Sequence, residues 1–133
     1  MDLSLWNDIV QNSEIFGYIG GKLFNREVVI SYNLWFNESI SSQEDLDFCL
    51  SYYSHINSFY LTNYAGSNYI YESGKRMPDY IDYMKNQLKL KSIAETKTVL
   101  TENSYKVIQK RMAGYIFAML YNSDTKDTVM QPL

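Results

Sequence analysis

Hydrophobic side chains recur along the chain with two different periods, and the period indicates which segments are helices and which are strands. Leu3, Trp6, Ile9 and Val10 are three or four positions apart or adjacent, which is the spacing of one helix face. Residues 1–13 are therefore expected to form a short helix or arm at the start of the chain.

Apolar and polar residues alternate in the segments that follow, and this alternation is typical of strands. Glu14–Ile19 and Lys22–Phe36 are expected to be strand segments joined at Gly20-Gly21, because glycine adopts a positive φ at little cost in a hairpin turn. Three more strands are expected near the end of the chain, at 88–101, 105–112 and 115–121, with a bulge at Gly114 between the last two.

A helical period returns in the middle of the chain. Ser41 and Glu44 have the spacing of a capping box, so a helix is expected from about Ser42 to Ala65, where Gly66 ends it. Because it is apolar on two sides, this helix is expected to be central and covered on both. One stripe is Leu46, Cys49, Leu50, Tyr53, Ile56, Tyr60 and Tyr64, and the other is Phe48, Tyr52, His55 and Phe59.

Strands at both ends of the sequence, with helices between them, predict an α+β fold. The expected architecture is an antiparallel sheet packed against the long central helix and one or two shorter helices, one of them from Pro78 to about Gln87. With 133 residues, of which 46% are hydrophobic, the chain suits one core. Residues 1–121 are expected to be a single domain, and 122–133 a polar tail.

The charge is distributed unevenly, although the formal net charge is only −3. Residues 1–60 hold eight acids and two bases, a net of −6, and residues 61–133 hold seven acids and ten bases, a net of +3. Such asymmetry is found at partner surfaces. The single cysteine, Cys49, allows no disulfide within the chain, and neither a signal peptide nor an apolar run of membrane length is recognised. The cytoplasm is the expected location, with no membrane partner.

No catalytic set is recognised. His55 is the only histidine, and Cys49, six positions earlier, would lie on a different side of the helix. One histidine and one cysteine cannot make a thiolate or imidazole metal cluster, so no metal and no cofactor are expected. The protein is therefore predicted not to be an enzyme. Two acid pairs are interpreted as ordinary helix-start residues, Glu44 with Asp47 and Asp79 with Asp82.

Four short segments are shared in order with a group of bacterial domains: Phe16-Gly17, Leu23–Ile30, Ile40–Gln43 and Leu88–Ile93 before a strand hairpin. On these segments, residues 15–121 resemble small domains found among toxin-immunity proteins. The resemblance implies a non-enzymatic protein that binds and neutralises a cognate toxin. It carries over no site residue, because the acidic-His-Gly tract that tends to end the last strand in that group is replaced here by Asn122-Ser123-Asp124.

Protein binding is the leading functional hypothesis. Tyrosine occurs thirteen times, and tyrosine is enriched at interfaces because it combines a large contact area with a polar end. The partner surface is predicted to include Glu44, Asp45 and Asp47 at the start of the central helix, with Tyr52. Such an acidic surface would suit a basic partner, such as a toxin.

Two alternatives of other classes remain open. The chain could be a small-molecule-binding protein or a small enzyme with a pocket lined by tyrosine and by His55. It could also bind nucleic acid through the basic segment Lys75–Arg111, although the net negative charge argues against general nucleic-acid binding.

Overall fold

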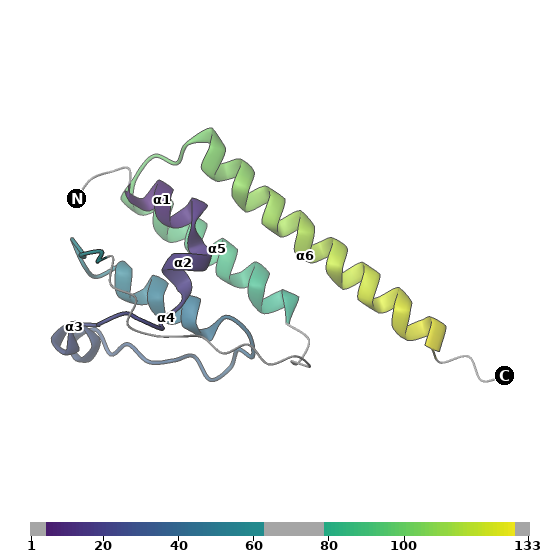
Figure 1. The fold of residues 1–133 in the computed structure, drawn as a ribbon, viewed down its shortest axis with the longest axis horizontal. Helices are drawn as coiled ribbons and strands as arrows, with labels where there is room; N and C mark the ends of the chain where they lie inside the picture. The colour runs from purple at the N-terminus through teal and green to yellow at the C-terminus, as the bar shows by residue number, and fades with distance from the viewer. Residues whose placement is uncertain (1–4, 63–78, 130–133) are drawn as a thin grey trace.

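The computed structural model describes residues 5–62 and 79–129, without the side chains of 122–129, and every regular element in these ranges is a helix (Figure 1). The α+β prediction, with its antiparallel sheet, is therefore wrong. The helices are α1 (Leu5–Gln11), α2 (Ser13–Gly17), α3 (Arg26–Ser31), α4 (Glu44–Tyr53), α5 (Tyr80–Lys97) and α6 (Glu102–Val129).

Two long helices, α5 and α6, run side by side in opposite directions, and other described helices pack against them (Figure 1). α1 packs against both of them, α4 packs against α5, and α2 joins α1 to α4. α3 lies at the edge, beyond α4 (Figure 1). The second half of α6 extends past the other helices, through part of the expected polar tail.

α5 shows why one of the strand predictions failed. The alternation in Leu88-Lys89-Leu90-Lys91 imitates a strand, but the buried residues Gln87, Leu90 and Ala94 are three and four positions apart, as on a helix face. Asp79 caps the helix, because its Oδ1 accepts from the backbone N–H groups of Ile81 (2.9 Å) and Asp82 (3.4 Å). The helix expected to end near Gln87 therefore continues to Lys97, through the predicted strand.

α6 replaces the predicted strands 105–112 and 115–121 and the turn before them. Its start is stabilised by Thr101, whose Oγ1 accepts from the backbone N–H of Ser104 at 3.2 Å. Lys106 pairs with Glu102 at 2.6 Å, four positions away, on the helix surface. Gly114, expected at a bulge, lies within the helix, where a Cβ atom would meet nothing within 4 Å.

The central helix is shorter than expected. α4 ends at Tyr53, and residues 56–62 are not helical, so His55 and Phe59 lie outside it; residues 63–65 lie outside the described part. Within α4 both expected stripes are buried, as Leu46, Cys49, Leu50 and Tyr53 on one side and Phe48 and Tyr52 on the other.

The predicted capping box at Ser41 is also wrong. Gln43 precedes α4 with a positive φ of 61° and makes no side-chain cap. Ser41 is used elsewhere, because its backbone N–H donates to Asp82 Oδ2 at 2.7 Å, and Ser42 Oγ accepts from the backbone N–H of Asp79 at 2.8 Å. The loop before α4 is thereby attached to the start of α5.

The N-terminal third is helical where strands were expected. α2 overlaps the predicted strand 14–19 and α3 lies within the predicted strand 22–36, whereas the helix expected in residues 1–13 is confirmed by α1. Gly20-Gly21 does form a turn, with a positive φ of 72° at Gly21, but it joins helices and not strands. α3 begins at a side-chain cap, since Asn25 Oδ1 accepts from the backbone N–H of Glu27.

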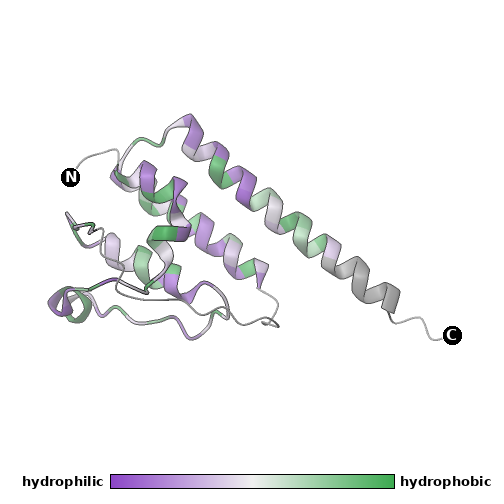
Figure 2. Ribbon diagram, in the orientation of Figure 1, coloured by the Kyte–Doolittle hydropathy of each residue, from purple (hydrophilic) through white to green (hydrophobic). Residues whose placement is uncertain are grey.

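The core lies where α1, α4 and α5 meet. Trp6, Ile9 and Val10 of α1 belong to one cluster of buried residues with Leu50 of α4 and Leu90 of α5. Figure 2 shows the alternation of polar and apolar faces along these helices, and a hydrophobic stretch of α6 where it leaves the other helices.

A buried polar junction joins the first described helix to the start of the last. Asn7 Oδ1 accepts from Ser104 Oγ at 2.7 Å and from the backbone N–H of Thr101 at 2.9 Å, and Asn7 Nδ2 donates to Val99 O at 3.3 Å. Arg111 donates to Val10 O at 2.6 Å and to Gln11 O at 3.1 Å, which ties the end of α1 to α6.

Candidate functional site

The three acids predicted at a partner surface share the first turn of α4 but have different surroundings. Glu44 is exposed. Asp47 forms an ion pair with Lys89 at 2.6 Å, and Lys89 also donates to Ser51 Oγ at 2.8 Å. Asp47 therefore belongs to the α4–α5 contact, and its charge is already compensated.

Asp45 is half-buried and faces another part of the molecule. Burial raises the pKa of the Asp45 carboxyl above its ordinary value, and the charge of Glu44 acts in the same direction. The backbone N–H of Ile19 and the ammonium of Lys22 lower the pKa but do not cancel the effect of burial. Lys22 is itself engaged, because Nζ donates to Ile15 O at 2.9 Å and to Tyr18 O. The Asp45 carboxylate is therefore incompletely compensated.

Asp45 lines an open hollow of about 180 Å³ between α2, the start of α4 and α6. Two carboxylate and two phenol side chains are among the polar groups that line it. The lining residues are Ser13, Glu14, Gly17, Tyr18, Gln43, Asp45, Leu46, Arg111 and Tyr115.

The charged groups in the lining sum to −1, from Glu14, Asp45 and Arg111. The Arg111 guanidinium is held by the two carbonyl oxygens at the end of α1, so part of its hydrogen-bonding capacity is used within the fold. Gln43 Oε1 is buried without a hydrogen-bond partner among the described residues. The acceptors that the hollow offers are therefore mainly the two carboxylates of Glu14 and Asp45.

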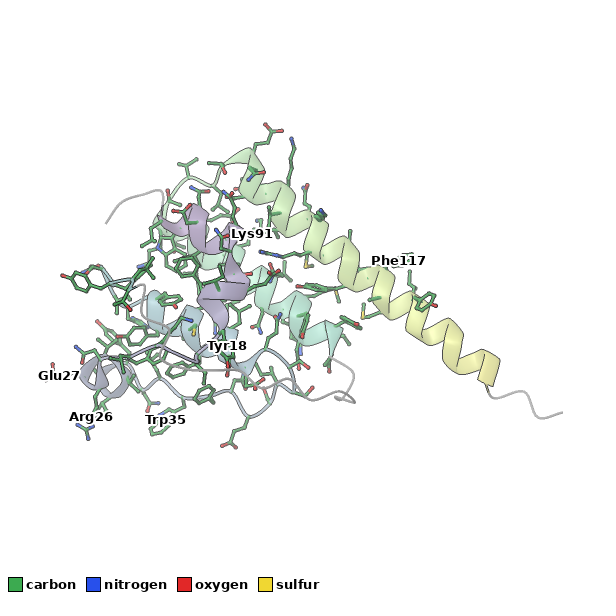
Figure 3. All side chains as sticks on the ribbon, in the orientation of Figure 1. Tyr18, Arg26, Glu27, Trp35, Lys91 and Phe117 are labelled. Atoms are coloured by element: carbon green, nitrogen blue, oxygen red, sulfur yellow. The ribbon has the colours of Figure 1, made fainter. Side chains whose placement is uncertain are left out.

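Two tyrosine rings complete the hollow. Tyr115 is partly buried, and burial raises its pKa above the ordinary value, while the nearby Arg111 lowers it. Tyr115 is fixed from the far side by Tyr83 of α5, whose ring centroid lies 5.2 Å away in an edge arrangement. Tyr18 comes from the segment after α2 and is labelled in Figure 3. Carboxylates with aromatic faces are the groups that bind organic cations.

Tyr52, predicted to contribute to the partner surface, is buried in the core. Its hydroxyl accepts from the backbone N–H of Asn25 at 2.9 Å, and its ring meets Phe24 edge-on at 5.0 Å. It positions the segment before α3 and does not reach the hollow.

His55 is exposed just after α4, and its ring stacks on Tyr32 with a centroid distance of 3.8 Å and an interplanar angle of 14°. It does not line the hollow. The structure therefore does not bring His55 together with Asp45.

The other chemically active groups fall into structural contacts. Cys49 is fully buried, and burial raises the pKa of its thiol to about 11. No group of three or more potential metal-ligating side chains is found among the described residues. Much of the predicted basic segment is ion-paired, as Lys85 with Asp82, Lys89 with Asp47, Lys91 with Glu95 and Lys106 with Glu102, while Lys75 and Arg76 lie outside the described residues.

Sequence reasoning did not identify Glu14, Tyr18, Arg111 or Tyr115 as site residues, because all four were assigned to strands or their edges. One signal was available, since Arg111 and Tyr115 are four positions apart and therefore share a helix face. The neighbourhood of Glu14 and Asp45 depends on the packing of α2 on α4, which no local pattern encodes.

Comparison of the chain with family models, with curated proteins and with solved structures gave no match. None of the helices in the described ranges has the length and apolar character needed to cross a membrane. The class of protein that the fold and the hollow define is therefore a small helical domain with an acidic, tyrosine-bearing depression.

Proposed function

We propose that this chain is a non-enzymatic protein-binding domain that receives a lysine or arginine side chain of a basic partner protein in the hollow. The observation that carries the proposal is the convergence of Glu14 and Asp45 with the rings of Tyr18 and Tyr115 around one open depression. A cation beside an incompletely compensated carboxylate gains Coulomb energy, and aromatic faces add a cation–π contribution.

The partner class follows from charge. Most of the residues that line the hollow come from the N-terminal, acidic half of the sequence, and Glu44 is exposed beside it. Exposed acids of this kind accelerate association with a basic protein, whereas an anchor held in the depression slows dissociation. Neutralisation of a basic toxin, which the sequence resemblance implies, is one form that this function would take.

The alternative functions have less support from the arrangement of side chains. A tyrosine- and histidine-lined pocket would require His55 near the hollow, and it stacks on Tyr32 elsewhere. A nucleic-acid surface would require uncompensated cations, whereas Lys85, Lys89, Lys91 and Lys106 each lie beside a carboxylate.

The test uses single capped residues as probes. N-acetyl-arginine amide and N-acetyl-lysine amide are titrated into the full chain and followed by NMR chemical shifts, with N-acetyl-norleucine amide as the uncharged control. We expect shifts clustered at Glu14, Asp45 and Tyr115 for the two cations only, with affinities in the millimolar range that is ordinary for one anchor.

Two neutral variants locate the binding. Glu14→Gln and Asp45→Asn should each weaken the shifts several-fold, and Glu27→Gln, exposed on α3 and outside the lining, should leave them nearly unchanged. Binding should also weaken as the pH falls through the raised pKa of Asp45, because protonation removes its charge. Equal responses to norleucine, or responses unaffected by Asp45→Asn in a folded variant, would contradict the proposal.

A further inference from the structure

The charged and aromatic groups of the hollow come from different elements of the fold. Glu14 belongs to α2 and Asp45 to α4, whereas Tyr115 belongs to α6. Tyr18 follows α2, near the place where α2 packs on α4 (Figure 3). A ligand in the hollow is therefore offered two carboxylates from two helices together with two aromatic rings.

A close contact between α2 and α4 sets the spacing of the two carboxylates. A Cβ atom at Gly17 would lie 2.7 Å from Leu46 Cδ1 and 3.1 Å from Leu46 Cβ, so glycine is what allows the two helices to approach this closely. Both residues line the hollow. Glu14 is three positions before Gly17, and Asp45 directly precedes Leu46. The contact therefore fixes how far apart Glu14 and Asp45 stand.

Charge alone would hold a cation only weakly in the hollow. The lining sums to −1, because Arg111 offsets one of the two carboxylates, and Lys22 lies beside Asp45 outside the lining. A further point charge near these two cations gains little Coulomb energy in an open, hydrated site. Hydrogen bonds and ring contacts therefore decide which cation is preferred.

Arginine and lysine differ in how they can use such a site. A guanidinium is planar, its N–H groups pair with carboxylates at its edges, and its weakly hydrated faces stack on aromatic rings. An ammonium is a compact, strongly hydrated charge with three donors and no flat face. A guanidinium can bond to Glu14 and Asp45 while its faces contact tyrosine rings, whereas an ammonium gives up more hydration for fewer contacts.

We propose that the hollow is an arginine site that discriminates against lysine, so that the basic partner presents an arginine to it. The inference rests on the proposed function and names which of the two basic side chains that function uses. Glu14 and Asp45 accept from the guanidinium, and the tyrosine rings contact its faces. Gly17 is a positioning residue, because it sets the spacing of the two carboxylates.

The first experiment compares ligands that differ only in the charged group. N-acetyl-homoarginine amide is N-acetyl-lysine amide with its amine converted to a guanidinium, so the two have the same aliphatic chain. We expect the arginine and homoarginine probes to bind the full chain at least about five-fold more tightly than the lysine probe, in NMR titrations followed at Asp45 and Tyr115. N-acetyl-citrulline amide, which keeps the planar shape without the charge, should bind no better than the norleucine control.

The outcomes separate this inference from the function on which it rests. Equal affinities for the lysine, homoarginine and arginine probes, or tighter binding of lysine, would overturn the choice of arginine and leave a general cation-binding hollow. Binding of none of the three cations would overturn both proposals. Citrulline binding as tightly as arginine would show that shape and not charge is recognised, which also contradicts the inference.

Gly17→Ala tests whether the spacing of the carboxylates carries the discrimination. The added methyl group should push α2 away from α4 and lower the ratio of arginine to lysine affinity several-fold, because an ammonium does not depend on bridging both carboxylates. The double variant Gly17→Ala with Leu46→Ala should recover much of the ratio, since the methyl group then has room. Gly114→Ala is the matched control and should leave the ratio unchanged, because a Cβ there would meet nothing within 4 Å.

Glu14→Gln makes the same test without changing the packing of α2 on α4. With one carboxylate left, the variant should lose more affinity for the arginine probe than for the lysine probe, and circular dichroism checks that each variant is folded. An affinity ratio that stays at the wild-type value in folded Glu14→Gln or in folded Gly17→Ala would overturn the proposed recognition of arginine by two spaced carboxylates.

Discussion

Single buried groups in this protein show how burial changes chemical behaviour. Among the cysteine and carboxyl groups, the Cys49 thiol has the pKa that burial changes most. Its pKa rises to about 11 because the buried thiolate loses its contact with solvent. The thiolate is the reactive form, so both inaccessibility and the raised pKa suppress its chemistry.

We expect Cys49 in the folded protein to react at least a hundred-fold more slowly with a thiol reagent at pH 8 than in denaturant. The measurement is the rate of release of a chromophore from an aromatic disulfide reagent, with and without urea. Comparable rates in the two conditions would show that the site opens readily and that α4 is not firmly packed.

We expect the free energy of unfolding to depend on pH through the carboxyl group of Asp82. Its pKa is lowered, first because its carboxylate accepts the backbone N–H of Ser41, and also because Lys85 lies beside it. A group with a lowered folded-state pKa contributes stability above its unfolded-state pKa and loses that contribution as the pH falls through its folded-state pKa.

Asp82→Asn should therefore lower the free energy of unfolding by about 1–2 kcal/mol at neutral pH, since a charge-assisted hydrogen bond becomes a neutral one. The difference from wild type should disappear as the pH falls below the lowered folded-state pKa of Asp82, where the wild-type carboxyl is protonated too. Urea denaturation across the pH range checks this. A difference that stays constant into acid would mean that Asp82 acts through its shape and not through its charge.

At the scale of the element, α5 contains the sharpest contrast between a strand and a helix. In a strand, Leu88 and Leu90 would lie on the same face; on a helix they are roughly 200° apart. The structure has Leu90 fully buried and Leu88 55% exposed.

Leu90→Ala should cost about 2–5 kcal/mol of unfolding free energy, whereas Leu88→Ala should cost less than about 1 kcal/mol. Denaturant titration of the two variants, which differ only in position, makes the comparison. Similar large losses for both would indicate a strand and would contradict the helical arrangement.

The accuracy of the sequence-based predictions differed from one helix to another. The helical spacing of Trp6, Ile9 and Val10 identified α1, and the stripes in α4 were assigned to the core correctly, because burial on one face leaves a direct periodic mark. In α5 and α6 the same periodicity was present in Gln87, Leu90 and Ala94, but lysine alternating with leucine, and the continuous apolar run to Tyr121, imitated strands. For such runs, local pattern does not separate an inner strand from a helix.

The candidate site was less accessible to sequence than the fold. Asp45 was selected with Glu44 and Asp47 because all three begin a helix, and nothing local distinguishes the acid in a hollow from one in an ion pair. That distinction depends on Lys89, Glu14 and Arg111 arriving from other helices, which is a consequence of packing.

At the scale of the whole molecule, one junction closes the fold. The hydrogen bond from Ser104 Oγ to Asn7 Oδ1 joins residues 97 positions apart and is buried. Polar groups taken out of water at such a junction are costly to leave unpaired.

Asn7→Ala should lower the free energy of unfolding by about 2–4 kcal/mol, because the Thr101 N–H and the Ser104 hydroxyl lose their acceptor. Asn57→Ala, at an exposed loop position, is the control and should change stability by less than about 0.5 kcal/mol. Stopped-flow kinetics should show the loss mainly as faster unfolding, since long-range contacts form late. A mainly slower folding rate would place the junction in the nucleus instead.

The same junction has a consequence for synthesis of the chain. At about 5–20 residues per second, the ribosome needs roughly 5–20 seconds to pass from Asn7 to Ser104. During that interval Trp6, Ile9 and Val10 have been made, while Leu90 and Ala94, which help to bury them in the finished core, have mostly not. The growing polypeptide therefore presents the apolar residues of α1 during this interval, and chaperones that bind nascent chains should hold residues 5–11 until α5 and the start of α6 have emerged.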